Sequence, residues 1–333
     1  MNIYIDKENL KSYVKSASRS AFSDCNRMLK NQLNIKFTFS KKEIAQDNDI
    51  KEWTKTMNTG VNGNIDWEVS PPKRPLKPES IPSFTKAQLS SIYLLNNKYT
   101  DEIDHYGLII YGGIGKEVDI INSLLMKDSD YGFMKQIPIK RLSHWKDLQN
   151  YLSPCSDIIL IDKFIFSSEE INKYNIDTLL ETLCFKAKDA IINIVIFTLP
   201  YIDEKINDKT VKTKLNRNDY INYIDSIKKS VEGITRVEPN VTIIISSNLG
   251  EHDRQIFTNY KYIESGDSFN YFDSTWAVIT KGRHIELFSL ANRDFYDNGI
   301  DFVNDMQTLV DNVRRVNSGN IIGAQICNYL KFK

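Results

Sequence analysis

Three short apolar runs constrain the fold of this chain most strongly. They are DIILID at 157–162, IINIVIFT at 191–198 and VTIIIS at 241–246. A strand that faces water on one side alternates apolar and polar residues, whereas a strand buried on both faces does not. Helical patterns at 176–187 and 220–231 separate the three runs. The sequence therefore predicts an α/β fold in which helices cover both faces of a sheet.

The rest of the C-terminal half adds antiparallel pairing to this sheet. Residues 254–263 are typical of a hairpin, and further strands are expected around 276–279 and 284–288. The sheet should therefore be mixed. A final amphipathic helix is indicated by apolar residues at helical spacing: Ile300, Val303, Met306, Val310 and Val313.

Proline marks the main boundary along the chain, because five of the nine prolines fall in SPPKRPLKPESIPSF. Proline removes an amide donor and fixes φ, so we expect 71–86 to be a linker or an extended arm. It separates a smaller α+β region at 1–70 from an α/β region at 87–154 and a larger domain at 155–333. Within the middle region we expect strands at 91–95 and 108–111 and helices at 117–126 and 143–152.

Composition excludes several classes of protein. Lys plus Arg and Asp plus Glu both number 43, which argues against a histone-like, charge-driven binder but leaves room for a local basic site. The four cysteines form no CxxC pair, so we expect neither a zinc site nor a disulfide framework. The N-terminus has no signal-peptide pattern and no apolar run reaches the length of a membrane span. We expect a soluble, cytoplasmic protein without a metal or other cofactor, and the richness in Asn, Ile, Lys and Tyr suggests a bacterial source.

The stretch SSNLGEHDRQIFTNYKYIESGDSFNYF carries the strongest chemical signal. His252 and Arg254 are two residues apart on an expected strand, so their side chains should share one face. Asn259 follows His252 by seven residues and Gly266 follows it by fourteen. A phosphodiester is an anion whose negative charge rises in the transition state of hydrolysis, so an imidazole that attacks phosphorus needs a cation beside it. Two further polar residues follow the glycine: Ser268 and Asn270.

This spacing resembles the phospholipase D superfamily, whose pattern is His-x-Lys, four residues and an Asp, then a Gly-Ser-x-Asn segment. The resemblance covers roughly residues 155–295, and only 252–270 matches a motif. It implies that His252 is the nucleophile and that Arg254 binds a phosphate oxygen. It also implies phosphate-binding roles for Asn259, Ser268 and Asn270 and supporting roles for Asp253 and Gly266.

Two departures from that pattern favour binding over catalysis. Arg254 stands at the Lys position and Asn259 at the Asp position, and a guanidinium is planar and bulkier than an ammonium. In this respect the chain is similar to the degenerate phospholipase-D-like domain at the C-terminus of MIT-domain proteins. Catalytic members need two motifs. The other His-x-Lys, at His144 and Lys146, lies in a helical pattern, so a complete site requires a homodimer.

Four weaker signals have plainer interpretations. The turn at 111–116 lacks P-loop spacing, so we expect an ordinary turn rather than an anion site. Asp6 follows a strand as in PIN-type nucleases, but a cap is the favoured interpretation. Arg283–His284 fits a polar pair at a sheet edge and could add a phosphate contact. The basic excess at 203–218 fits a solvated loop, with contact to a phosphate backbone as the alternative.

Three functions remain open. The first is a phosphodiester-binding protein that we expect to bind nucleic acid. It would be a non-catalytic or weakly catalytic subunit of a bacterial complex with protein partners, with antiviral defence as an analogy. The second is a metal-independent nuclease or phosphodiesterase that acts as a homodimer through His252. The third is a structural, partner-binding subunit with a vestigial motif.

Overall fold

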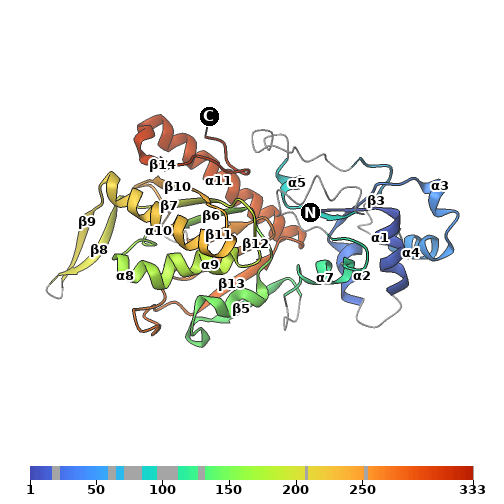
Figure 1. The fold of residues 1–333 in the computed structure, drawn as a ribbon, viewed down its shortest axis with the longest axis horizontal. Helices are drawn as coiled ribbons and strands as arrows, with labels where there is room; N and C mark the ends of the chain where they lie inside the picture. The colour runs from blue at the N-terminus through green and yellow to red at the C-terminus, as the bar shows by residue number, and fades with distance from the viewer. Residues whose placement is uncertain are drawn as a thin grey trace.

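Two sheets and one separate ribbon make up the computed structural model (Figure 1). It describes residues 1–16, 23–58, 65–70, 85–95, 112–126, 132–206, 209–250 and 254–332. The larger sheet is mixed, has eight strands and is flanked by helices, and the smaller sheet near the N-terminus is parallel. The predicted α/β class is therefore confirmed.

The larger sheet has the strand order β14-β10-β7-β6-β11-β12-β13-β5. Neighbouring strands β10, β7 and β6 run parallel, and the other pairs are antiparallel. The three apolar runs of the sequence form the parallel centre of the sheet, as expected. The strands are β5 (Met134–Pro138), β6 (Asp157–Asp162), β7 (Asn193–Thr198), β10 (Asn240–Ile245), β11 (Arg254–Thr258), β12 (Lys261–Ser265), β13 (His284–Ser289) and β14 (Ile321–Gly323).

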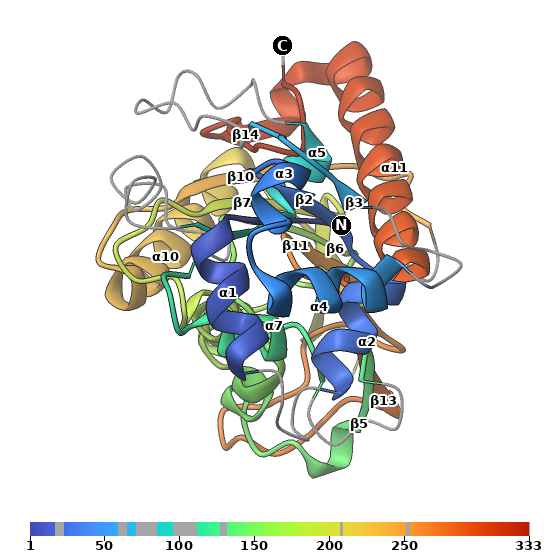
Figure 2. The same ribbon diagram turned by 90° about the vertical axis from the view of Figure 1, so that its right-hand side faces the viewer.

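Helices bury both faces of this sheet, which explains why its central strands lack polar alternation. Alternate residues of one strand enter different clusters: Leu160 packs with α9 (Thr178–Cys184) and α10 (Arg217–Thr235), whereas Ile161 packs with α11 (Arg293–Asn317). Figures 1 and 2 show α11 running along the face opposite to α9 and α10. Each strand therefore contributes apolar side chains to two cores.

The antiparallel half contains both a confirmed and a wrong prediction. The hairpin at 254–263 is present as β11 and β12, with Ile256 opposite Ile263. The strand expected at 276–279 is absent, since this loop makes only an isolated bridge between Phe272 and Val278. Asp273 accepts three hydrogen bonds from the loop backbone and a threonine hydroxyl, which closes a turn in place of a strand.

The segment expected to be a solvated loop, 203–218, is instead mostly a two-stranded ribbon. Strands β8 (Tyr201–Ile206) and β9 (Lys209–Lys214) pair antiparallel over their full length. The ribbon projects away from the larger sheet in Figure 1. Alternating Thr, Val and Lys in β9 suits a strand whose side chains face solvent, and polarity alone does not distinguish such a strand from a loop.

The smaller sheet has the order β3-β2-β1-β4 and is covered by helices at the end of the molecule opposite the ribbon (Figures 1 and 2). Asp6 accepts hydrogen bonds from the backbone and side-chain nitrogens of Asn9, at 2.8 and 3.1 Å, and so acts as the expected cap. The strands are β1 (Asn2–Ile5), β2 (Asn34–Phe37), β3 (Ile65–Asp66) and β4 (Ile92–Leu94). The helices are α1 (Lys7–Ser16), α2 (Ser23–Asn31), α3 (Lys41–Ile44), α4 (Asn48–Asn58), α5 (Lys86–Leu89) and α7 (Glu117–Asn122).

The middle region, 87–154, is divided between the two sheets. Its first strand, β4, joins the smaller sheet, and its last, β5, forms the edge of the larger one. The strand expected at 108–111 and residues 71–84 of the proline-rich segment lie outside the described residues. The helix expected at 143–152 is a 3-10 helix, and the remaining short helices are η5 (Ile139–Arg141), η6 (Trp145–Tyr151), α8 (Glu169–Asn172), the π-helix η7 (Lys173–Asp177) and η8 (Ser318–Asn320).

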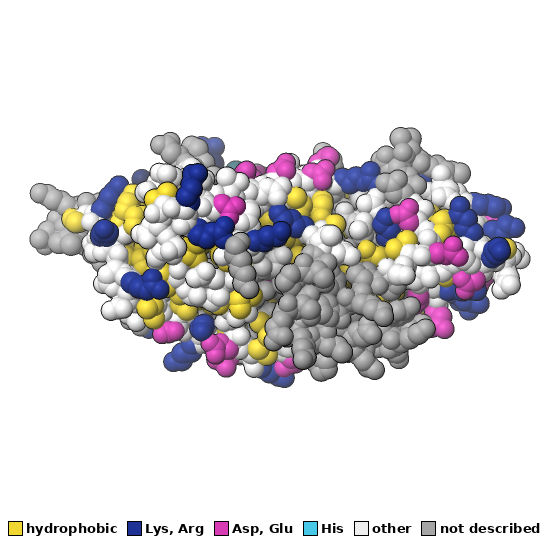
Figure 3. All heavy atoms as spheres, turned by 90° about the horizontal axis from the view of Figure 1, so that it is seen from above, with side chains coloured by type: hydrophobic (Ala, Val, Ile, Leu, Met, Phe, Trp, Pro, Cys, Tyr) yellow, Lys and Arg dark blue, Asp and Glu magenta, His cyan; other side chains and the backbone are white. Residues whose placement is uncertain are grey.

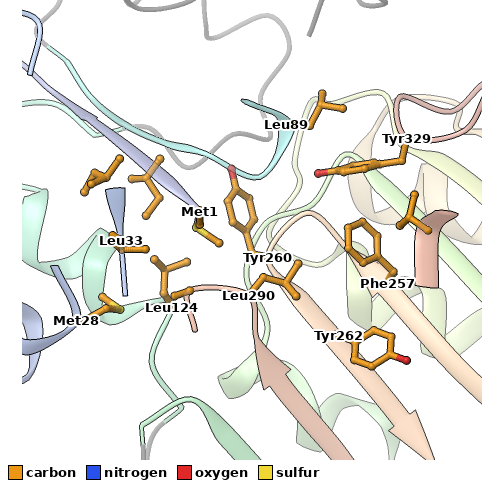
Figure 4. Packing of buried hydrophobic residues seen from close by; sticks show 14 of the residues in the cluster. Met1, Met28, Leu33, Leu89, Leu124, Phe257, Tyr260, Tyr262, Leu290 and Tyr329 are labelled. Carbon is orange, nitrogen blue, oxygen red and sulfur yellow. The ribbon is translucent and has the colours of Figure 1, made fainter. Parts of the chain in front are cut away.

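One hydrophobic core joins the two sheets. Figure 4 shows Met1 of the smaller part close to Tyr260 and Leu290 of the larger part, and Leu89 near Tyr329. The Tyr260 hydroxyl, buried in this core, donates a hydrogen bond of 2.9 Å to the Ser91 carbonyl. In the described residues, no helix is long and apolar enough to cross a membrane.

Candidate phosphate-binding site

Arg254 begins β11 at the edge of the sheet where the parallel strands end. In the antiparallel register it lies opposite Asp162, the last residue of β6. Strands β7 and β10 run parallel to β6, so Thr198 and Ile245 end at the same edge. In open α/β sheets the carboxyl ends of strands are the usual place for ligands, because the loops that follow them converge there. The motif therefore lies where this architecture favours a site.

Asp162 is the buried anchor of this edge. One carboxylate oxygen accepts hydrogen bonds from the Ser268 hydroxyl at 2.8 Å and the Phe269 amide at 2.7 Å, and the other accepts from the Phe164 amide at 2.9 Å. Burial raises the pKa of Asp162 to about 6, against the opposing effect of these hydrogen bonds and of the Arg254 guanidinium. The carboxylate thus ties the turn after β12 to the end of β6.

Ser268 and Asn270 hold this turn in place. The Ser268 hydroxyl donates to Asp162, and the Asn270 side-chain nitrogen donates to the Phe164 carbonyl. The Asn270 Oδ1 atom is buried and has no hydrogen-bond partner among the described residues. A buried acceptor without a donor is uncommon in native proteins. Asn270 therefore combines a structural bond with an acceptor that is still unused.

Asp267 organises the other side of the turn. Its carboxylate accepts from the Thr280 hydroxyl at 2.5 Å, from the Lys281 amide at 3.2 Å and from the Ser268 amide at 2.9 Å. Partial burial alone would raise the pKa of Asp267, but these hydrogen bonds, together with Arg254, hold it below its usual value. Both carboxylates near Arg254 are therefore occupied by backbone and hydroxyl donors.

The Arg254 guanidinium keeps most of its hydrogen-bonding capacity. The side chain is partly exposed, and among the described residues its one hydrogen bond is a long contact of 3.4 Å from Nη1 to the Gly266 carbonyl. A guanidinium carries five N–H donors in a planar fork that matches two oxygens of a phosphate. Arg254 can therefore donate to an anion without breaking a strong internal bond.

An open hollow of about 460 Å³ adjoins this turn. Lys281, Arg283 and His284 line it together with the acidic residues Glu264 and Glu286. The two glutamates are partly engaged, because Gln255 donates to Glu264 at 3.2 Å and Gln136 donates to Glu286 at 2.7 Å. The hollow is therefore of mixed charge, with Lys281 and Arg283 exposed at its rim. It is lined by Glu264, Ser265, Gly266, Lys281, Gly282, Arg283, His284 and Glu286.

The structure does not bring Asn259 to this cluster, although the motif spacing suggested a phosphate contact. Its amide is fully buried at the opposite end of β11, five residues and about 16 Å from Arg254 at the usual rise of a strand. The Asn259 oxygen accepts from the amides of Ser156 and Asp157, at 2.7 and 3.1 Å, and its nitrogen donates to the Leu89 carbonyl. Asn259 thus joins three segments of the core.

The remaining motif residues are placed only in part. His252 and Asp253 lie outside the described residues, so the structure describes no position for the imidazole that the resemblance makes the nucleophile. Gly266 is exposed in the turn and offers its carbonyl to Arg254. In the described part of the chain, no group of His, Cys, Asp and Glu is arranged to hold a metal ion.

Sequence reasoning missed Asp162, although a signal for it was present. The run DIILID ends in an acid directly after a buried strand, where a carboxylate at the carboxyl edge of the sheet is expected. What the sequence does not show is that this edge also receives Arg254 and the turn carrying Ser268, because Ser268 is 106 positions away from Asp162 in the chain.

The weaker candidates have structural roles in the described residues. His144 caps η6, accepting from the Lys146 amide at 3.0 Å, and stacks on Trp276 with ring centroids 3.8 Å apart. The Gly-rich turn before α7 is closed by Glu117, which accepts from the Gly115 amide at 2.9 Å. Neither the His-x-Lys pair nor this turn adds to the Arg254 cluster.

Comparisons with known proteins give only distant similarity. No family model matches the chain, and no curated protein matches it. A structure of phosphatidylserine synthase from Haemophilus influenzae is similar with a TM-score of 0.27 and 10% identity over 54% of this chain and 36% of that one. The archaeal chromatin protein TrmBL2, whose structure shows a novel mode of DNA binding, is similar with a TM-score of 0.25 and 9% identity over 57% and 59%. Similarity at this level carries no argument about fold or function, and membership of the phospholipase D superfamily stays a prediction.

Proposed function

We propose that this protein recognises phosphodiesters, with nucleic acid as the ligand, through the Arg254 cluster. The observation that carries this proposal is that the Arg254 guanidinium is available to bind an anion. It lies at the carboxyl edge of the sheet, it is partly exposed, and among the described residues it makes a single long hydrogen bond. Its two acidic neighbours, Asp162 and Asp267, are occupied by backbone and hydroxyl donors. An anion can therefore bind the guanidinium without displacing an internal ion pair.

Lys281 and Arg283 extend this positive charge along the rim of the hollow. The Lys281 amide is fixed by Asp267, which sets where the exposed lysine side chain leaves the backbone. No ion pair is found for Lys281 or Arg283 within the described residues. Together with Arg254 they suit a ligand that carries more than one phosphate, as a polynucleotide does. Binding without hydrolysis is the activity that this arrangement of cations supports best.

The test is binding of a fluorescent 20-base-pair DNA duplex to the full chain and to Arg254→Gln. A hydrogen bond to a charged group contributes about 1.5–3 kcal/mol, so the variant should bind roughly 10- to 150-fold more weakly. Arg254→Lys should recover only part of the loss, because an ammonium keeps the charge but not the bidentate geometry. The matched control is Arg315→Gln, an exposed arginine on α11. Equal binding by Arg254→Gln and Arg315→Gln would refute the proposal.

Incubating the same proteins with the duplex and checking whether it is cleaved distinguishes binding from hydrolysis. Cleavage of the duplex that persists in EDTA and is lost in His252→Ala would assign the enzymatic alternative, a nuclease of the phospholipase D type. Such an enzyme should also be a dimer at the concentrations used, since one chain carries one motif. Tight binding by a chain that leaves the duplex intact supports the non-catalytic function.

A further inference from the structure

The hollow beside the Arg254 cluster is large enough to hold part of a ligand. Its volume of about 460 Å³ lies within the range of about 300–1,000 Å³ that is common for small-molecule sites. Gly266 lines the hollow, and the Gly266 carbonyl accepts the hydrogen bond from the Arg254 guanidinium. A phosphate bound to this guanidinium therefore lies next to the hollow, and the rest of the same nucleotide can enter it.

Two glutamates in the wall of this hollow lie directly opposite each other. Glu264 of β12 and Glu286 of β13 are partners in the antiparallel register. The Cβ atoms of such a pair are about 5 Å apart, and like charges placed in this way destabilise a sheet. Neither glutamate forms an ion pair within the described part of the chain. The fold thus keeps two carboxylates side by side although their repulsion lowers its stability.

One oxygen of each carboxylate is engaged and the other is available. Gln255 donates to Oε1 of Glu264 at 3.2 Å, and Gln136 donates to Oε1 of Glu286 at 2.7 Å. Each glutamine is the register partner of its glutamate, so the four side chains form a row across β11, β12, β13 and β5. Among the described residues, the Oε2 atom of either glutamate has no hydrogen-bond partner. The hollow therefore offers two positioned acceptors that require hydrogen-bond donors from a ligand.

The charges around the hollow distinguish the parts of a nucleotide. Lys281 and Arg283 are exposed at its rim and suit phosphates, whereas the two carboxylates in its wall repel them. The charge of the whole protein does not make this distinction, because the formal net charge is zero and Figure 3 shows basic and acidic side chains intermixed over the face that it draws. The bases of DNA and RNA carry N–H donors. A base therefore suits the carboxylates, while the phosphates stay at Arg254 and the rim.

We infer that the hollow binds an unpaired guanine of the nucleic acid whose phosphate is bound at Arg254. The Watson–Crick edge of guanine presents two adjacent donors, N1–H and the 2-amino group, which match the two available carboxylate oxygens. Adenine and cytosine present one donor group beside an acceptor, and thymine and uracil present one donor between two carbonyls. In a duplex this edge of guanine is paired with cytosine, so the bound guanine is single-stranded or flipped out. This inference rests on the proposed function and adds the base to it.

The experiment measures binding of the full chain to four fluorescent DNA strands of equal length. One strand contains only thymidine, and the other three carry one central guanosine, inosine or adenosine. The guanosine strand should bind roughly 5- to 150-fold more tightly than the thymidine strand, which is the discrimination expected for a bidentate pair. Inosine lacks the 2-amino group and should recover only part of this gain, and adenosine should recover none.

The variant Glu264→Gln/Glu286→Gln tests the two carboxylates. It should bind the thymidine strand as tightly as the wild type or more tightly, because two negative charges are removed, and it should lose the preference for guanosine. The ratio of two affinities within one protein does not change when part of the protein is misfolded. The matched control is Glu170→Gln/Glu232→Gln, which makes the same change of charge at two exposed glutamates of α8 and α10 outside the hollow and should keep the preference.

The same strands separate failure of this inference from failure of the proposed function. Arg254→Gln should weaken the binding of all four strands by a similar factor. Equal binding of the four strands by the wild type, a preference for adenosine, or a guanosine preference that survives in Glu264→Gln/Glu286→Gln would each refute the guanine site. The proposed function stands in these cases if Arg254→Gln weakens binding. If Arg254→Gln binds every strand as tightly as the wild type, both are refuted.

Discussion

The ionisation of Asp162 depends on the groups that surround its carboxylate in the candidate site. It is fully buried, yet three donors and the nearby Arg254 guanidinium keep its pKa at about 6 rather than higher. The Asp162 carboxyl group therefore loses its proton as the pH rises through about 6. Asp162 interacts with the Arg254 guanidinium. The negative charge that Asp162 carries once it is ionised therefore opposes the binding of an anion at Arg254.

Duplex binding should consequently weaken as the pH rises through about 6. Below that value Asp162 is neutral, and above it the carboxylate repels the bound phosphate by on the order of 1 kcal/mol, or about fivefold. Asp162→Asn should lose this part of the pH dependence. The measurement is affinity for the duplex between pH 5 and 7.5, a range in which a phosphodiester does not titrate. Identical profiles for wild type and variant would show that Asp162 does not act on the site.

At the scale of elements, the edge strand β14 depends on a glycine. Gly323 has φ of 111°, and a Cβ there would lie 2.1 Å from the Val241 carbonyl oxygen. Its partner in the register is Thr242 of β10. A side chain would therefore impose both backbone strain and a collision with the neighbouring strand, and only glycine lets β14 approach β10.

Gly323→Ala should lower the free energy of unfolding by about 2–3 kcal/mol, through strain at a positive φ together with the steric conflict. Gly233→Ala is the matched control, because no atom lies within 4 Å of its added Cβ and the residue is inside α10. That variant should gain about 0.5–1 kcal/mol from helix propensity. Urea denaturation of both variants measures the difference. A Gly323→Ala protein as stable as Gly233→Ala would contradict the strand pairing.

At the scale of the whole molecule, buried polar contacts join the two sheets. Asn259 and Tyr260, after β11, bond to the carbonyls of Leu89 and Ser91. Lys261 is fully buried, and its ammonium donates to the Leu124 carbonyl at 3.0 Å. Three consecutive residues of the larger sheet thus hold the N-terminal part by side-chain hydrogen bonds.

Lys261 makes stability depend on pH. Burial lowers its pKa to about 7, with a smaller effect of Lys186, whereas the unfolded chain keeps the usual value of 10.5. Between these values the unfolded state binds a proton that the native state lacks, so the free energy of unfolding rises with pH. The slope contributed by Lys261 should approach 1.4 kcal/mol per pH unit between pH 7 and 9.

Lys261→Met removes this titration and should flatten the pH dependence, even though the Leu124 carbonyl loses its donor. The measurement is urea denaturation at pH 7, 8 and 9. An unchanged slope in the variant would show that Lys261 is not the group responsible.

The sequence by itself determined the sheet class and the place of Arg254. An uninterrupted apolar run such as DIILID predicts a strand buried on both faces without reference to the rest of the chain. The hairpin at 254–263 is predicted by its local alternation of apolar and polar residues. Likewise, a residue at the start of a strand is predictable from that strand alone. The ribbon was predicted as a loop because polarity alone does not distinguish a solvent-facing strand from a loop.

Only the tertiary structure decided which residues surround Arg254. Asp162 joins it through strand pairing, and Ser268 and Asn270 are held there by bonds to the end of β6. Asn259, close to Arg254 in the chain, is carried to the opposite end of β11 and into the core. The spacing of a motif gives only the number of residues between two positions. Each residue of a strand lies about 3.3 Å further along the sheet, so residues close in sequence can lie far apart. Strand pairing, in contrast, brings distant segments together.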